Sequence, residues 1–323
     1  MKKRRLNIEI LTKICCFVLV LSTICFGFVG CKKKTPKIPE QLETEDNNGI
    51  EEPIVNVYNT TTEQVEQMPL ETYLLGVVAG EMPNNFPSEA LKAQAIIART
   101  FTMYFIANRQ SKYEGADIST DISEAQAYAP ENINDAICEA IAETKGKVLA
   151  FGGEFIETWF HSNAGGKTAS TTEAFVGSDG DPEFIKLATS PETENNAQNT
   201  TWSVWLSRSE MLSALSKMGK SVSTLSTISI EEKGPSGRAT ALKFGDTVVS
   251  APEFRIAVGS TKMKSTLISN IVVDKSGATF EGKGYGHGVG LSQWGAKILA
   301  EEGKDAENII DHYFKKVDLV ELY

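Results

Sequence analysis

Apolar residues in the first half of the chain repeat at the spacing of two consecutive helices. The first stripe predicts a helix that ends near Met82-Pro83, because proline disfavours the helical conformation of the residue before it; its members are Leu70, Tyr73, Leu74, Val77 and Val78. A second helix is predicted from Pro87-Ser88, with Ser88 as N-cap and an apolar face of Leu91, Ala95, Ala98, Thr102 and Phe105. Glu81 should therefore lie at the junction between two helices.

The rest of the chain mixes strand and helix patterns. Two apolar runs flank Gly152-Gly153 and predict a hairpin, after which His161 leaves the end of a strand. Other strand-like runs lie at 202–205 and on both sides of the turn 234–237. Further helices are predicted around 132–145, 209–218, 292–302 and 305–314. This mixture predicts an α+β fold of helices and antiparallel sheets, with two lobes around a substrate cleft.

The N-terminus has the pattern of a targeting segment. Basic residues at 2–5 precede an apolar run from 14 to 31, and three lysines follow it. The run is long enough to span a bilayer, and its basic flank favours an N-in orientation. Two interpretations of 1–34 stay open: an uncleaved membrane anchor, or a lipoprotein signal in which Val29-Gly30-Cys31 resembles a lipobox and Cys31 is acylated. Both place the body at the extracytoplasmic face of the cell membrane.

A polar stretch separates this segment from the body. Residues 35–54 are rich in Pro, Glu, Asn and Thr, and they contain too little apolar surface to fold alone. We interpret them as a flexible tether, which leaves 55–323 as the folded domain.

Charge argues against nucleic acid as a partner. The formal net charge is −10, but residues 1–37 hold nine of the 32 Lys and Arg side chains and only one of the 42 acids. Residues 38–323 therefore carry 23 basic and 41 acidic side chains, a net charge of −18. Such a body repels phosphate backbones at long range.

Cysteine usage indicates neither a disulfide nor a thiolate metal site. Four of the five cysteines lie in the N-terminal segment, so Cys138 is alone in the body. One cysteine cannot form an internal bridge or a thiolate-rich zinc site. We predict that Cys138 is a small core residue of its helix, and we predict no metal and no other cofactor.

Glu81 has two interpretations from its position alone. A carboxyl group between two apolar helices is partly desolvated, which raises its pKa and keeps a proton available for acid catalysis near neutral pH. Alternatively, the carboxylate accepts hydrogen bonds from N–H groups at the start of the second helix, which is a common structural use of an acid. Residue type alone favours the helix cap.

The segment 161–168 contains residues suited to a ligand site. His161 precedes a loop that ends in Gly165-Gly166-Lys167-Thr168. This is not a phosphate-binding P-loop, because that motif needs glycine where His161 stands. Its glycines permit close approach of a ligand, so a binding site and a structural loop explain the segment equally well.

The segment 284–295 has glycine at every second position up to Gly290. Tyr285, His287, Gln293 and Trp294 supply hydrogen-bonding and stacking groups, and a site lining is slightly favoured over a tight structural loop. A Ser-His-Asp triad is not indicated, because neither Ser162 nor Ser292 lies in a Gly-x-Ser-x-Gly elbow.

Several separated motifs occur together. The run 70–83 contains Gly80-Glu81-Met82-Pro83 and is followed by Phe86-Pro87-Ser88-Glu89-Ala90 and Ala98-Arg99-Thr100. Further motif segments are 126–128, 161–168, 253–259, 264–266 and 284–295. In sequence and order they resemble the stage II sporulation protein D family, also called the SpoIID/LytB domain, over about 55–320.

The resemblance implies a lytic transglycosylase of the engulfment machinery in which Glu81 is the catalytic acid. It also implies a substrate groove, whose candidate lining residues are Arg99, Gln126, Tyr128, His161, Ser162, Lys167, Tyr285, His287, Ser292 and Gln293. Expected partners are peptidoglycan glycan strands, the membrane through the N-terminal segment, and other cell-wall hydrolases. A noncatalytic glycan-binding enhancer of a cell-wall amidase is the alternative.

The sequence departs from part of the family at three places. Some members ligate zinc through cysteines after the histidine motif or carry a cysteine pair before the Gln-x-Tyr segment, and here both regions lack cysteine. Ala164 and Gly80 stand where hydroxyl residues are frequent. These differences concern the polarity of the site.

Overall fold

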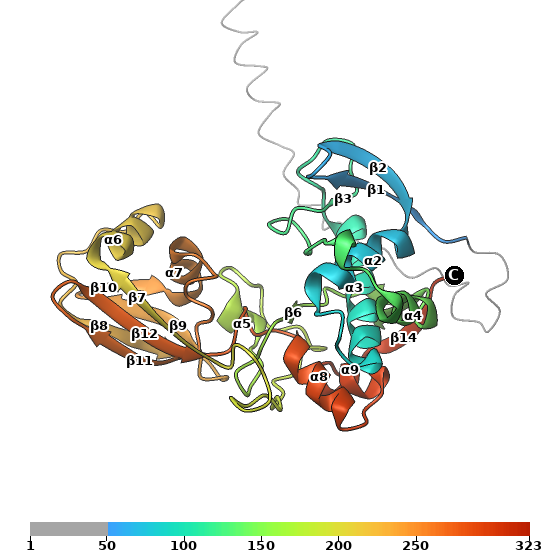
Figure 1. Cartoon of the computed structure of the whole chain (residues 1–323). Helices are drawn as coiled ribbons and strands as arrows, with labels where there is room; N and C mark the ends of the chain where they lie inside the picture. Colours follow the sequence, from blue (N-terminus) through green and yellow to red (C-terminus); the bar gives the residue numbers. More distant parts are fainter. Residues whose placement is uncertain (1–50) are drawn as a thin grey trace, which may run out of the picture. The chain divides into compact units, whose positions relative to one another are not determined.

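A computed structural model describes residues 51–323 (Figure 1). The predicted targeting segment 1–34 and nearly all of the predicted tether 35–54 lie outside the described residues. Within 51–323, no helix combines the length and the apolar composition needed to cross a bilayer.

The described elements are mixed α and β. The helices are α2 (Leu70–Glu81), α3 (Ser88–Asn108), η2 (Pro130–Asn132), α4 (Asp135–Glu143), α5 (Thr171–Ala174), α6 (Arg208–Lys217), α7 (Ala251–Val258), α8 (Gln293–Glu301) and α9 (Ala306–Tyr313). The strands are β1 (Ile54–Asn59), β2 (Gln64–Pro69), β3 (Ile118–Ser119), β4 (Lys147–Phe151), β5 (Glu154–Phe155), β6 (Phe160–His161), β7 (Thr201–Ser207), β8 (Ile228–Lys233), β9 (Ala239–Phe244), β10 (Thr247–Ser250), β11 (Ile268–Val273), β12 (Gly277–Lys283), β13 (Leu291–Ser292) and β14 (Asp318–Glu321).

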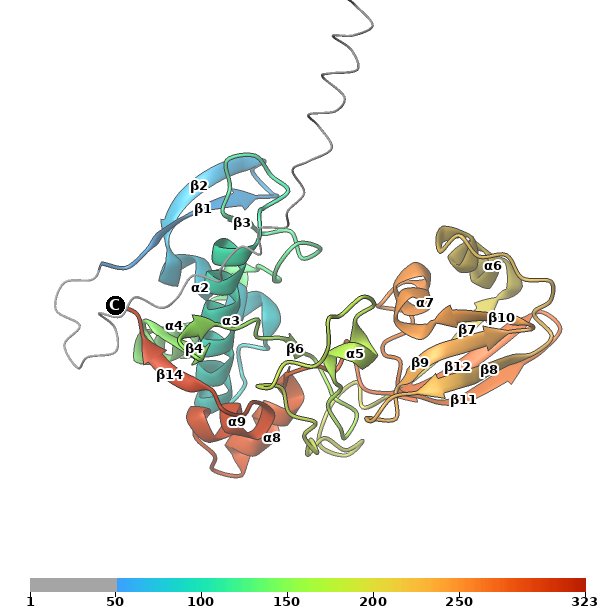
Figure 2. The same ribbon diagram turned by 180° about the vertical axis from the view of Figure 1, so that it is seen from behind.

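The larger hydrophobic core surrounds α3. This helix contacts α2, α4, β4 and the C-terminal helices α8 and α9, as Figure 1 shows. Its central residues are nearly all buried, which explains why its apolar positions continue around the helix. The antiparallel pairing of β14 with β4, visible from behind in Figure 2, fixes the C-terminus to the hairpin of β4 and β5. The first and last thirds of the chain therefore share one core.

A second hydrophobic core is built by residues 202–280. It contains two three-stranded antiparallel sheets, ordered β10-β9-β8 and β11-β12-β7, together with α6 and α7. Ser207 caps α6 through a reciprocal capping box with Glu210, so β7 leads directly into the helix.

Several predicted details need correction. Ser88 is the first residue of α3 rather than its N-cap, because Pro87 takes that position without a side-chain hydrogen bond. Cys138 is exposed on α4 rather than part of the core. The sheets are mainly antiparallel, but β1 pairs with β3 and β13 with β6 in parallel.

Candidate active site

A cleft of about 480 Å³ contains the carboxyl group of Glu81. Its lining residues lie in 81–175 and 285–293, segments on either side of the second core in sequence. Seven of the predicted site residues line it: Glu81, Gln126, His161, Ser162, Tyr285, His287 and Gln293. The cleft thus draws its lining from segments outside 202–280, whereas the sequence predicts a cleft between two lobes.

Glu81 is the last residue of α2, and its carboxylate is held by two amides. Oε1 accepts a hydrogen bond of 2.6 Å from the backbone N–H of Ala127, and Oε2 accepts one of 3.4 Å from Nε2 of Gln293. Both donors lie outside α3, so the predicted helix cap is wrong. The carboxylate instead connects the end of α2 with the 125–128 segment and with α8.

Two glycines of α2 allow the 127–129 segment to approach Glu81. A Cβ on Gly80 would lie 2.8 Å from the carbonyl carbon of Ala127 and from the nitrogen of Tyr128, which is closer than real Cβ contacts. One turn earlier, the carbonyl of Gly76 accepts a hydrogen bond from the N–H of Ala129, and the Tyr128 ring covers the same glycine. The absence of a hydroxyl residue at Gly80 therefore has a packing explanation.

The environment of Glu81 favours its protonated form. Burial raises the pKa of the Glu81 carboxyl above its ordinary value, and the hydrogen bonds from Ala127 and Gln293 oppose this effect without cancelling it. The C-terminal end of a helix is also an unfavourable place for a negative charge. Such a carboxyl group can donate a proton at a pH where an exposed glutamate cannot.

The glycines of 284–290 explain how the two loops of the site fit together. A Cβ on Gly286 would lie 2.6 Å from Cβ of His161, and one on Gly284 would lie 2.7 Å from the carbonyl oxygen of Asn163. Backbone hydrogen bonds join Asn163 and Tyr285 in both directions. The tight-loop interpretation and the site-lining interpretation both apply, because Tyr285 and His287 line the cleft between glycines packed on the neighbouring loop.

The two cleft histidines share one backbone residue, Val289. Nδ1 of His161 lies 3.1 Å from the carbonyl oxygen of Val289, so it carries the proton that this contact requires. Nδ1 of His287 accepts a hydrogen bond of 3.1 Å from the N–H of Val289. Burial first, and then His287 and Arg238, hold the pKa of His161 well below its usual range, and burial with nearby Arg255 lowers the pKa of His287 to about 3. Both rings are therefore neutral near neutral pH.

Two buried acceptor atoms beside the cleft lack a protein partner among the described residues. They are Nε2 of His161 and Oε1 of Gln126, whose Nε2 donates to Oγ1 of Thr102 over 3.0 Å. A buried acceptor without a donor is unfavourable unless a ligand or water supplies one. The site is suited to a ligand rich in hydroxyl and amide donors.

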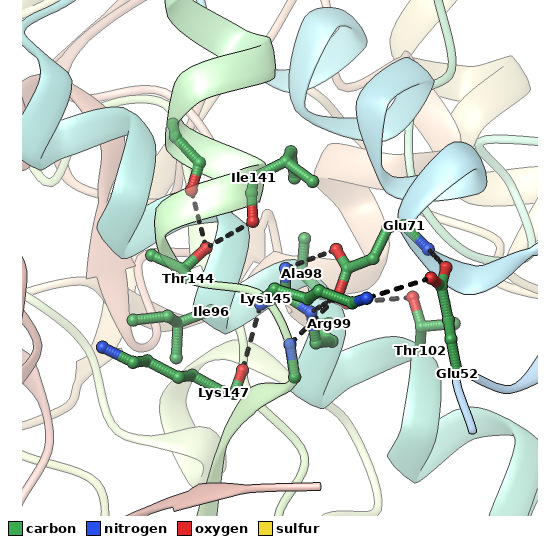
Figure 3. A network of polar contacts seen from close by, with 12 residues as sticks. Glu52, Glu71, Ile96, Ala98, Arg99, Thr102, Ile141, Thr144, Lys145 and Lys147 are labelled. Carbon is green, nitrogen blue, oxygen red and sulfur yellow. Dashed lines mark hydrogen bonds and ion pairs between the residues drawn. The ribbon is translucent and has the colours of Figure 1, made fainter. Parts of the chain in front are cut away.

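Arg99 lies away from the cleft in a buried polar network (Figure 3). Its guanidinium binds both carboxylate oxygens of Glu71, at 2.8 and 2.6 Å, and donates to the carbonyl oxygen of Lys147. The Glu71 carboxylate also accepts from the N–H of Gly146 and the hydroxyl of Tyr323. All these contacts are within the fold, and they give Arg99 a structural role.

Tyr128, Lys167 and Ser292 are also placed outside the cleft lining. The Tyr128 ring stacks on Tyr73 at 5.8 Å, and Nζ of Lys167 donates to the carbonyl oxygen of Pro235. Ser292 is fully buried, caps α8 through the N–H of Gly295, and hydrogen bonds to Glu192. They support the loops that carry the lining residues.

The cleft also contains residues that sequence reasoning missed. Glu157 is ion-paired with Arg109, and burial raises its pKa while Arg109 opposes this. Glu124 accepts hydrogen bonds from Oγ of Ser111 and from the N–H of Lys112. Apolar surface comes from Phe101, Ile122, Trp159 and Phe175. Charged residues inside the otherwise apolar run 154–159 were the signal available for Glu157.

Within residues 51–323, no three His, Cys, Asp or Glu side chains are grouped as metal ligands. The lack of cysteine near His161 in the sequence points the same way.

Comparison with known proteins gives two family matches and several relatives. The SpoIID family, described as Stage II sporulation protein, matches residues 58–151, and a domain of unknown function, DUF8618, matches 180–290. Stage II sporulation protein D of Bacillus amyloliquefaciens is 31% identical over 294 residues, covering 83% of this chain and 78% of that protein. The Bacillus subtilis protein of the same name is 29% identical over 294 residues, covering 83% and 79%.

A third relative is named for a different activity. The amidase enhancer of Bacillus subtilis is 29% identical over 288 residues, which cover 75% of this chain and 39% of that protein. The sporulation proteins are covered much further, and the SpoIID match contains Glu81 and Gln126. The chain therefore belongs to the stage II sporulation protein D family.

Proposed function

We propose that this protein is a lytic transglycosylase that cleaves peptidoglycan glycan strands between N-acetylmuramic acid and N-acetylglucosamine, with Glu81 as acid and base. The observation that carries the proposal is a carboxyl group whose pKa is raised by burial, held by two neutral amides in a cleft with open hydrogen-bond acceptors. Membership of the family supports it.

The proposed chemistry needs one carboxyl group. Glu81 donates its proton to the glycosidic oxygen as the bond to C1 of the muramoyl residue breaks. The resulting carboxylate takes the proton of the muramoyl C6 hydroxyl while that oxygen bonds to C1, which leaves a 1,6-anhydro end and restores the acid. Ordinary glycoside hydrolysis instead uses a second carboxylate that activates water or attacks C1.

The other two cleft carboxylates are less suited to the acid role. Arg109 stabilises the charged form of Glu157, and Glu124 shows hydrogen bonds that stabilise a carboxylate. Glu81 has neither a cation nor a hydroxyl among its hydrogen-bond partners within the described residues.

The neutral acceptors suit the same substrate. Nε2 of His161 and Oε1 of Gln126 can accept hydrogen bonds from sugar hydroxyls or from the N–H of an acetamido group. Trp159 and Phe175, whose ring centroids are 5.7 Å apart, add apolar surface on which a sugar face can pack.

Product analysis tests the proposal. Purified sacculi are digested with the protein, and the soluble fragments are analysed by mass spectrometry with and without borohydride reduction. We expect fragments with anhydromuramoyl ends, which resist reduction. Reducing ends in their place would indicate hydrolysis, and intact strands would indicate a noncatalytic protein.

The relative named amidase enhancer supports a second candidate, a glycan-binding protein that stimulates a cell-wall amidase. The same cleft could hold a strand without cleaving it. Release of stem peptides by an added amidase, measured with and without the protein, would then increase while anhydro ends stay absent.

The setting that we propose is the extracytoplasmic face of the cell membrane during engulfment in sporulation. The basic and apolar pattern of 1–34 and the relatives named stage II sporulation protein D support this setting. Peptidoglycan strands and other cell-wall hydrolases are its proposed partners.

The raised pKa of Glu81 predicts a characteristic pH dependence. The free enzyme must hold the proton, so kcat/KM should fall about tenfold per pH unit above the pKa of Glu81. The cleft histidines should add no limb near neutral pH, because both have lowered pKa values. Fragment release measured across the stability range of the protein checks this; a rate that rises through neutrality would remove Glu81 as the acid.

The same shift predicts a pH-dependent stability. Because the folded-state pKa of Glu81 is above its ordinary value of about 4.5, the folded protein holds a proton that the unfolded chain releases. Its contribution to stability is therefore present at low pH and is lost as pH rises through the folded pKa. Glu81→Gln should make this part of the profile flatter in urea unfolding.

A further inference from the structure

Arg238 connects the second core with the loop that carries His161. It lies just before β9, and its side chain is fully buried. Nη1 donates to the carbonyl oxygen of Lys167 and Nη2 to that of Ala164, each over 2.8 Å. One planar guanidinium therefore fixes both ends of the 164–167 loop.

The same guanidinium lies against the glycine loop. A Cβ on Gly288 would come within 2.5 Å of Cζ of Arg238, so the guanidinium fills the space that a side chain would need. Gly288 lies between His287 and Val289, and Val289 holds Nδ1 of both cleft histidines. Arg238 thus contacts the backbone next to the residue that orients both rings.

The turn that presents Arg238 is itself anchored on α5. The buried carboxylate of Glu173 accepts from the N–H of Ser236 at 2.8 Å and from its hydroxyl at 2.7 Å. Gly234 packs directly against Glu173, and Oγ of Ser236 accepts from Nη1 of Arg238. Burial lowers the pKa of Arg238 to about 10, and the carboxylates of Glu173 and Glu192 limit this shift, so the guanidinium stays charged at neutral pH.

We propose that Arg238 is a positioning residue for the cleft, through which residues 180–290, the part matched by a domain of unknown function, set the geometry of His161 and His287. Its effect on glycan cleavage rests on the proposed function, but the geometric effect on the histidines does not. This gives the second core a role in the active site although the cleft lining lies outside it.

Arginine is specifically suited to this position. Its fork reaches two carbonyl oxygens at once, whereas a lysine ammonium is a single point donor on a flexible stem. Arg238→Lys keeps the charge but can satisfy only one carbonyl well, and Arg238→Met keeps much of the length and removes every donor. The two variants therefore separate charge from geometry.

Histidine NMR provides a readout independent of activity. The chain contains three histidines, so the full-length protein labelled with ¹⁵N only at histidine gives few signals. In the wild type we expect His161 protonated at Nδ1 and His287 unprotonated at Nδ1. His312, which contacts the carbonyl oxygen of Thr189, serves as an internal reference.

In Arg238→Met, the tautomer signatures of His161 and His287 should lose their definition while His312 is unchanged. Turnover on glycan strands should fall up to about 100-fold, the size of effect seen when a supporting group is misplaced, with a smaller change in KM. Arg238→Lys should be intermediate in both readouts. Arg208→Met, on α6 of the same core, is the matched control and should leave both readouts unchanged.

Unchanged His161 and His287 signals in a folded Arg238→Met protein would overturn the proposal. If that variant does not fold, unchanged signals in Arg238→Lys would overturn it equally. Histidine signals that change in a wild-type background without glycan cleavage would leave the positioning role intact and reject the proposed function instead.

Discussion

Glu81→Gln should eliminate anhydromuramoyl products while the protein stays folded and still binds glycan strands. Glutamine keeps an oxygen for the N–H of Ala127 but has no proton to donate and no carboxylate to take one back. We expect a loss of at least ~100-fold in the rate of fragment release, in line with removal of a general acid. Product mass spectra, strand pull-down and melting temperature of the two proteins measure the three properties separately.

Glu139→Gln is the matched control, because Glu139 is exposed on α4 and lies outside the cleft lining. It should behave as wild type in all three measurements. Glu81→Gln protein that still releases anhydro ends at nearly the wild-type rate would exclude Glu81 from the mechanism. A variant that fails to bind strands would instead make Glu81 a binding residue.

Local patterns in the sequence predicted the position of Glu81 well. The apolar stripes and two prolines specify α2, α3 and the junction between them, because helix periodicity and proline sterics act within a few residues. The partners of Glu81 could not be predicted this way. Ala127 and Gln293 lie 46 and 212 residues away, and only tertiary packing brings them to the carboxylate.

The glycine loop shows the same limit from another side. Alternating glycines predicted close backbone packing but not its partner, which is the 159–165 segment together with Arg238. Ser292 looked equally available for a ligand, yet its hydroxyl caps α8 and is fully buried. Residue type indicates what a side chain can do, and the fold decides which of these contacts remain open.

Cys138 illustrates an error of a different kind. Its small side chain suggested a core position, but α4 buries only Ile137, Ala140 and Ile141, whose spacing defines a narrow apolar face. Cys138 falls just outside this face and is exposed. Helical phase rather than residue type determines its burial.

Arg99→Ala should cause the largest loss of stability among the substitutions considered. Arg99 is fully buried with a bidentate ion pair to Glu71, and removal of the guanidinium leaves a mostly buried carboxylate without its cation. Breaking one partner of such a pair typically reduces the free energy of unfolding by about 3–5 kcal/mol. Urea unfolding measured by circular dichroism checks this value, and Lys262→Ala provides the matched control.

Lys262 pairs with Glu210 on the surface, where both side chains are well exposed, so its removal should change the free energy of unfolding by about 0–1 kcal/mol. The difference between the two variants measures the effect of burial on an ion pair. Glu71 also binds Gly146 and Tyr323, so loss of Arg99 should loosen the attachment of the C-terminus and increase proteolysis there. If Arg99→Ala is instead as stable as Lys262→Ala but binds glycan strands at least ~10-fold more weakly, a shift of about 1.4 kcal/mol, Arg99 belongs to the substrate site and the structural role given to its network is wrong.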